Sequence, residues 1–138
     1  TKGTTTGAIT AAMSGRTIIV GPLAAGLAAD SIFSLPTAAD GLNYRFVYVG
    51  GAADAEDFQL NTGSNTNFFI GGLTQFDPTD DTENEPVPIF GNNSSNSRVN
   101  ILTPNIGTSV EVYCDGTNWF LSGIVISATA TAVTFADQ

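Results

Sequence analysis

Short runs of alternating apolar and polar residues recur along the chain, and clusters of Gly, Pro, Asn or Asp separate them. The clearest pair of runs extends from Ser109 to Val125 and flanks the turn sequence Asp115-Gly116-Thr117-Asn118. An Asp-Gly step between two such runs is a strong hairpin signal, because both residues tolerate positive φ. In the run before the turn, the apolar residues share one side of the predicted strand. Glu111 and Tyr113 lie on its other side. The pattern therefore predicts a hairpin at the centre of the fold.

The same pattern predicts further strands over residues 8–12, 16–20, 31–35, 42–50, 58–61, 67–70 and 98–102, with one or two more over 124–135. Both faces of 42–50 carry apolar residues, which indicates cover on both sides, wholly or in part. A short helix and a loop are equally expected over residues 21–30. The strands over 58–61 and 67–70 are expected to pair with each other. A long loop is expected over residues 71–88. Turns at this spacing are typical of a sandwich or barrel. The expected fold is all-β, an antiparallel β-sandwich or flattened barrel of roughly nine to eleven short strands.

The chain has 138 residues, which fits a single domain. We expect a single β-sandwich domain over residues 8–138, preceded by a flexible N-terminal arm over residues 1–7. The arm is polar and rich in Thr and Gly. It is either an ordinary frayed terminus or a segment that becomes ordered on a partner.

Composition removes several classes of function. The net charge is −9, with four basic residues against thirteen acidic ones. Direct binding of nucleic acid needs clustered Lys and Arg, so we expect none, and we expect no docking on an anionic membrane. No apolar run approaches the ~20 residues of a membrane-spanning helix.

Candidates for catalysis are equally scarce. The chain contains no His, the commonest general base, so its many Ser and Thr residues lack the usual activating partner. Cys114 is the only cysteine, which excludes an intrachain disulfide, and a small buried hydrophobe is its preferred interpretation. Glu111 and Asp115 are interpreted as a solvated residue and a turn residue rather than as paired catalytic carboxylates. We therefore expect no enzyme activity, no catalytic residues and no cofactor.

An acidic cluster in the long loop raises the question of a metal. Carboxylate oxygens are the ligands that Ca²⁺ prefers, but the loop lacks the Gly and Glu positions of an EF-hand. A solvated acidic loop is the preferred interpretation, so no metal is expected. The weak candidates are Asp77, Asp80, Asp81, Glu83 and Glu85.

Aromatic residues offer two alternatives. Tyr44, Tyr48, Tyr113 and Trp119 could line a platform for a sugar, or they could fill the core. Filling the core is the preferred interpretation.

Four motifs follow one another along the chain: Ser14-Gly15-Arg16-Thr17, Leu35-Pro36, Gly41-Leu42 and the hairpin sequence Cys114-Asp115-Gly116-Thr117-Asn118-Trp119. Their order resembles a small jelly-roll-like family of tailed-phage virion proteins, chiefly capsid decoration (cement) or head-fibre proteins, which implies a jelly-roll-like form of the β-sandwich. The resemblance covers about residues 8–125, and the chain departs from the family pattern over residues 71–100.

This resemblance implies a homotrimer on the exterior of a phage capsid, made in the host cytoplasm, with the major capsid protein as its partner. It implies no direct contact with nucleic acid or membrane. The alternative is a phage fibre or appendage, or a carbohydrate-binding β-sandwich module, which would need an exposed aromatic platform.

For a decoration protein, the resemblance leads us to expect one set of residues that contact the capsid and one set that form the core. We expect the arm to contact the capsid as an added strand, with the candidates Thr1, Lys2, Thr4, Thr5 and Thr6. The residues expected to form the signature core of the fold are Leu35, Phe46, Val112, Cys114, Trp119 and Leu121.

Overall fold

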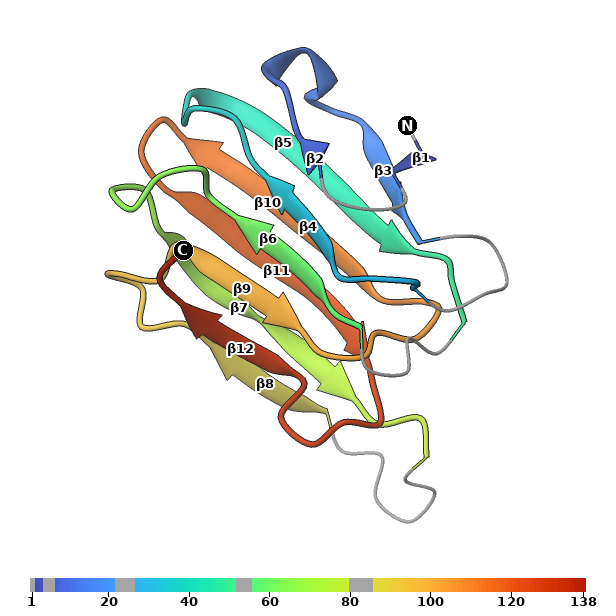
Figure 1. Ribbon diagram of the computed structural model, residues 1–138. Coiled ribbons are helices and arrows are strands. Elements are labelled where there is room, and N and C mark those ends of the chain that lie inside the picture. The colour runs from blue at the N-terminus through green and yellow to red at the C-terminus, as the bar shows by residue number, and fades with distance from the viewer. Residues whose placement is uncertain (1, 4–6, 22–26, 52–55, 80–85) are drawn as a thin grey trace.

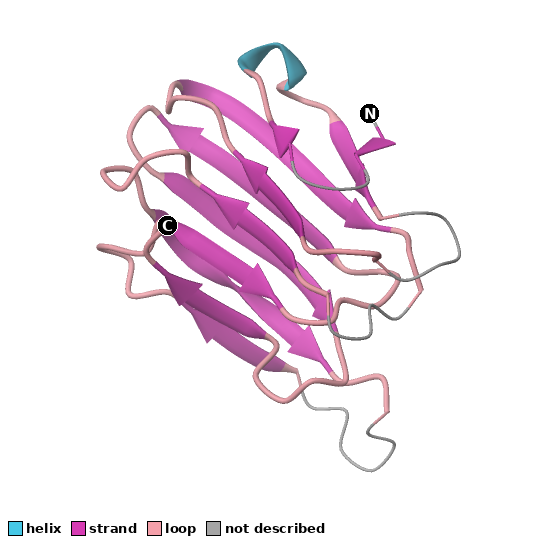
Figure 2. Ribbon diagram, in the orientation of Figure 1, coloured by secondary structure: helices cyan, strands magenta, loops and turns pink. Residues whose placement is uncertain are grey.

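Two β-sheets packed face to face form the molecule. The computed structural model describes residues 2–3, 7–21, 27–51, 56–79 and 86–138. In Figure 1 the strands of the smaller sheet lie over those of the larger one. Figure 2 shows that strands dominate and that a short helical turn, the only one among the described residues, lies near the N-terminus. The prediction of an all-β sandwich is confirmed.

Twelve strands are assigned in the described residues. Ten have four residues or more, which agrees with the predicted number, and the first two have two residues each. Their bounds are β1 Lys2–Gly3, β2 Gly7–Ala8, β3 Thr17–Val20, β4 Ser31–Ser34, β5 Asp40–Tyr48, β6 Phe58–Asn61, β7 Phe69–Phe76, β8 Val87–Phe90, β9 Arg98–Ile101, β10 Ser109–Asp115, β11 Trp119–Ile126 and β12 Val133–Ala136.

The larger sheet has seven strands in the order β1-β3-β5-β10-β11-β7-β8, and the smaller has five in the order β12-β9-β6-β4-β2. From β1 to β7 the chain passes to the other sheet after every strand. Strands β1, β3 and β5 of the larger sheet therefore alternate along the sequence with β2, β4 and β6 of the smaller sheet. As a result β1, β3 and β5 run parallel, and so do β2, β4 and β6. β7 and β11 also pair in parallel, and the five other pairings are antiparallel.

The expectation of antiparallel pairing therefore holds for only half of these pairings. Alternation in a sequence shows which side chains share a face, but it carries no information about the direction of the neighbouring strand. Alternation also does not show which strand is the neighbour. The predicted pairing of 58–61 with 67–70 is wrong, because β6 and β7 lie in different sheets.

Two segments depart locally from the prediction. The strand expected over 8–12 is replaced after β2 by a 3-10 turn, Ala11–Met13. The long loop expected over 71–88 is wrong at both ends, because β7 continues to Phe76 and β8 begins at Val87. Most of segment 21–30, where a short helix was one alternative, lies outside the described residues.

The core lies between the sheets and is continuous. Its largest fully buried side chains come from both layers, with Trp119 and Phe46 from the seven-stranded sheet and Phe58 from the five-stranded sheet. The rings of Phe46 and Phe58 lie 5.8 Å apart between centroids, which joins the layers at the centre. The structure buries all six residues of the proposed signature core, namely Leu35, Phe46, Val112, Cys114, Trp119 and Leu121.

The predicted hairpin is confirmed as β10 and β11. Gly116 takes a φ of 96°, whereas Asp115 remains in the strand. The Asp115 carboxylate accepts the backbone N–H groups of Thr117 at 2.8 Å and Asn118 at 2.7 Å. These bonds hold the pKa of Asp115 below its usual value. The Asp side chain thus stabilises the turn by hydrogen bonding, while Gly alone supplies the positive φ.

Candidate functional site

The outer faces of the two sheets, which point away from the core, differ in chemistry. On the five-stranded sheet the outer face is polar, and Gln59 and Arg98 both donate hydrogen bonds to Asn61, at 3.0 and 3.3 Å. Five of the six large hydrophobic side chains that are exposed among the described residues lie on the strands of the seven-stranded sheet. They are Val87, Phe90, Tyr113, Phe120 and Ile124. The seven-stranded sheet therefore offers the candidate binding surfaces.

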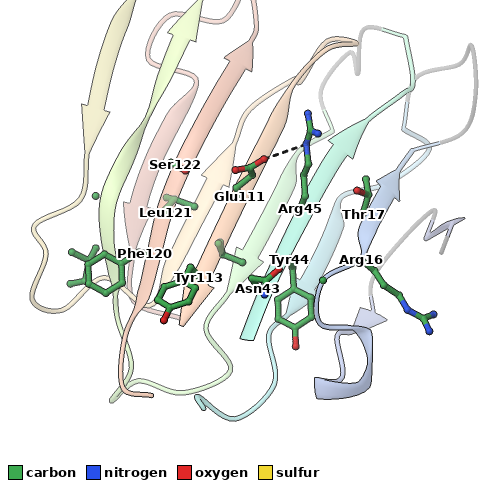
Figure 3. A pocket seen from close by; sticks show the side chains of 14 residues that line it. Arg16, Thr17, Asn43, Tyr44, Arg45, Glu111, Tyr113, Phe120, Leu121 and Ser122 are labelled. Atoms are coloured by element: carbon green, nitrogen blue, oxygen red, sulfur yellow. Dashed lines mark ion pairs between the residues drawn. The ribbon is translucent and has the colours of Figure 1, made fainter. Parts of the chain in front are cut away.

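One surface is a shallow groove of about 600 Å³ across β3, β5, β10, β11 and β7. We use "the groove" for six of its lining side chains: Asn43, Arg45, Glu111, Tyr113, Phe120 and Ser122. Figure 3 shows Tyr113 and Phe120 beside one another on the hairpin, with Arg45 and Glu111 farther along the same face.

The aromatic pair is set by strand register. Tyr113 and Phe120 are direct cross-strand partners on β10 and β11, and they are 46% and 45% exposed. The Tyr113 hydroxyl donates to the Asp40 carboxylate at 3.3 Å, and that carboxylate raises the pKa of the hydroxyl. The hydrogen bond anchors the Tyr113 ring and leaves its face open to solvent.

The next row of the groove is charged. Arg45 and Glu111 are cross-strand partners, and Arg45 Nε lies 3.5 Å from Glu111 Oε1. Arg45 Nε also donates to Ser109 Oγ at 3.1 Å. Both charged side chains are more than half exposed, so water screens the pair and its contribution to stability is small. The row instead supplies polar groups beside the aromatic pair.

The second surface lies at the edge of the same sheet. We use "the β8 strip" for Pro88 and Phe90 of β8 together with Ile124 of β11, which share the outer face of the sheet. Phe90 is 66% exposed and Ile124 is 46% exposed. Val87 is also exposed, but it is the cross-strand partner of the buried Gln75 and lies on the other face of β8. The Phe90 ring leans over Gly72, whose missing side chain leaves room for it. No charged residue occurs in β7, β8 or β11.

The structure separates the four aromatic residues considered for a sugar platform. Tyr44, Tyr48 and Trp119 are buried in the core, as the preferred interpretation held. The Tyr44 hydroxyl donates to Thr10 O at 3.1 Å and the Tyr48 hydroxyl to Gly51 O at 2.5 Å. Tyr113 is exposed, so the core interpretation is wrong for this residue.

Sequence reasoning missed Phe120, which is the partner of Tyr113. The signal was present, because alternation from a buried Trp119 directs Phe120 to the opposite face. The pairing of Arg45 with Glu111 had no such signal, since it depends on β5 and β10 being neighbours.

The other site candidates are less informative. Glu111 is exposed and Asp115 holds the turn, in line with their interpretation. Cys114 is fully buried, also as expected.

The acidic loop and the arm are described only in part. Asp77 accepts the backbone N–H and the hydroxyl of Thr79 at 2.8 and 2.7 Å. Within the described ranges no group of three or more acidic, Cys or His side chains is close enough to hold a metal. The other loop candidates, Asp80, Asp81, Glu83 and Glu85, lie outside the described residues, as do the arm candidates Thr1, Thr4, Thr5 and Thr6.

Lys2 is the one arm candidate that is described, and it belongs to β1. Lys2 and Gly3 pair in parallel with Ile19 and Val20 of β3, at the edge of the seven-stranded sheet. The described part of the arm is thus paired with the edge of its own domain.

Comparisons with known proteins gave no match, whether to a family model, a curated protein or a solved structure. The resemblance to phage virion proteins therefore depends on the motifs quoted above. In the part of the chain that is described, no helix has the length and apolar character needed to span a membrane.

Proposed function

We propose that the protein is a non-enzymatic structural protein of a phage virion, which decorates and stabilises the capsid as a homotrimer on its outer surface. The motifs shared with decoration and head-fibre proteins supply the virion context. The observation that carries the proposal is the β8 strip, because exposed apolar surface without charge is typical of a protein–protein contact.

The lack of charge on the strip favours a second copy of the chain as its occupant. Full burial of one large apolar side chain contributes about 1.5–3 kcal/mol. Phe90 and Ile124 are each roughly half to two-thirds exposed, so covering the strip contributes about 2 kcal/mol, which is only part of what a stable trimer needs. Chains of net charge −9 repel one another. An uncharged strip lets two copies meet with little direct repulsion, since salt screens charges beyond about 8 Å.

Attachment to a shell would stabilise it by linkage. A protein that binds only the assembled lattice shifts the equilibrium toward the shell by RT ln(1 + [L]/Kd). A trimer holds three attachment points together, which raises their effective concentration and strengthens binding without new contacts. Neither effect requires catalysis, which suits a chain that contains no His.

The arm over residues 1–7 is the proposed attachment to the major capsid protein. β1 is the outermost strand at its edge of the seven-stranded sheet. Backbone groups at such an edge favour pairing with a further strand. Deletion of residues 1–7 should therefore lower the occupancy of the protein on emptied capsids, and unchanged occupancy would contradict this part of the proposal.

Self-association is tested by the molar mass of the purified protein from light scattering. The wild type should have three times the mass of one chain, and Phe90→Ser should shift the mass toward one chain. Ile106→Ser is the matched control, because Ile106 is 64% exposed and lies outside the strip. A wild-type monomer, or a trimer unaffected by Phe90→Ser, would refute the role of the strip.

A further inference from the structure

We propose that the groove binds a neutral polysaccharide, through stacking on Tyr113 and Phe120 and hydrogen bonds to Arg45, Glu111 and neighbouring polar groups. This is an activity separate from assembly through the β8 strip. The two surfaces lie on the same sheet but use different side chains, so each can be tested alone.

The aromatic pair fits the shape of a sugar ring. A pyranose has faces made largely of C–H groups and a rim of hydroxyl groups. Tyr113 and Phe120 are adjacent in register and almost equally exposed. Cross-strand partners have Cβ atoms about 4.5–5.5 Å apart, which places two rings side by side under one or two sugar units. The hydrogen bond from Tyr113 to Asp40 holds one ring before binding, which lowers the entropic cost of stacking.

The polar groups lie where hydroxyl groups of the sugar would fall. Glu111 is the neighbour of Tyr113 on the same face of β10. Ser122 of β11 is the direct cross-strand partner of Glu111. Arg45 uses Nε for Ser109 and Glu111. Neither terminal nitrogen of its guanidinium donates a hydrogen bond to the described residues. The groove thus combines donors and acceptors with an apolar platform, within the roughly 300–1,000 Å³ typical of small-ligand sites.

The charge balance favours a neutral ligand. Arg16 and Arg45 line the pocket together with Glu111, and Asp40 lies beside Tyr113, so two positive charges meet two negative ones. The chain as a whole is acidic. An anionic polymer would meet this field without a cluster of basic groups to offset it.

The same ion pair argues against a protein surface as the occupant. A dry interface over the groove would remove Arg45 and Glu111 from water, and the cost of desolvation can exceed the attraction between them. Sugar hydroxyls can instead hydrogen-bond to both groups as they displace water. The β8 strip has no such pair, which is why the two surfaces are assigned different partners.

The test is affinity electrophoresis in gels that contain laminarin, soluble starch, galactomannan or xylan, with alginate as the anionic comparison. At least one neutral polysaccharide should retard the wild type. Tyr113→Ala and Phe120→Ala should each weaken that retardation by up to about tenfold in affinity. Tyr113→Phe keeps the ring and should retain most of the binding.

The control is Phe90→Ala, which removes an exposed aromatic side chain of the same sheet outside the groove. It should leave polysaccharide binding unchanged. Trp119 fluorescence of each variant reports whether the core is intact, because Trp119 is fully buried. Retardation by none of the neutral polymers, or equal retardation of wild type and Tyr113→Ala, would overturn the proposal. Retardation by alginate alone would overturn the neutral assignment, and loss of self-association in Tyr113→Ala without polysaccharide binding would make the groove a protein contact.

Discussion

Gln75 joins the seven-stranded sheet to the segment that leads into β12, and its replacement by Leu tests the packing of the sandwich. The side chain is 7% exposed. Its Nε2 donates to Thr129 O at 2.8 Å and to Ser127 O at 3.4 Å, and its Oε1 accepts the backbone N–H of Ala132 at 2.8 Å. Leu has nearly the same size and makes none of these bonds.

The expected loss follows from the groups left behind. Ala132 is fully buried, so water cannot replace the lost acceptor of its N–H without local opening. An unsatisfied buried backbone group costs about 1–3 kcal/mol. The carbonyl of Thr129 is only partly buried and recovers some hydration. Gln75→Leu should therefore lower the free energy of unfolding by about 2–4 kcal/mol, after a small gain from the apolar side chain.

Urea unfolding followed by Trp119 fluorescence measures this change, since Trp119 is the only Trp and is fully buried. Thr74→Ala is the matched control, because Thr74 precedes Gln75 on the outer face of β7. It should change the free energy of unfolding by about 0.5 kcal/mol or less. A Gln75→Leu protein as stable as the Thr74→Ala control would refute the assigned role of Gln75.

Three further changes test local features. Gly123→Ala should destabilise the fold by about 3 kcal/mol or more, because a Cβ there would lie 2.2 Å from Ser109 O at a φ of +141°. Its control is Gly41→Ala, which is also at positive φ but in open space. This substitution should cost only about 1 kcal/mol. Asp115 has a lowered pKa in the fold, so the stability it contributes is present above its unfolded pKa of about 3.9 and is lost as the pH falls through the folded value. Asp115→Asn should therefore flatten the acid side of the stability curve measured by urea unfolding, and an unchanged curve would contradict the account of the turn. The Cys114 thiol is fully buried and should react with a thiol reagent only at the rate of unfolding, whereas rapid reaction of the native protein would contradict its burial.

The hairpin was predictable because its alternation and its turn chemistry point to the same structure. Alternation along β10 and β11 assigned Val112 and Cys114 to one face, and these residues are buried. Where local pattern and turn chemistry agree in this way, sequence alone yields the two strands and the turn that joins them.

The continuation of β7 was not predictable, because Gly71 and Gly72 resemble a break in a strand. In the structure a Cβ on Gly71 would lie 2.7 Å from Leu121 O. Gly71 also takes a φ of 97°. The glycine is therefore needed for this backbone conformation and for close approach of the two strands, rather than to end the strand. That requirement comes from β11, which is far away in the sequence.

The groove was only partly predictable for a related reason. The outward position of Tyr113 follows from alternation, but its neighbours come from the order of β5, β10, β11 and β7. That order, with β7 parallel to β11, depends on long-range packing rather than on any local motif.

Decoration of a capsid can be measured by co-sedimentation of the purified protein with shells assembled from the major capsid protein encoded in the same genome. A decoration protein should bind saturably to assembled shells, should not bind unassembled capsid subunits, and should make occupied shells more resistant to heating, as linkage requires. Failure of the protein to sediment with shells, or equal binding to unassembled subunits, would rule out decoration.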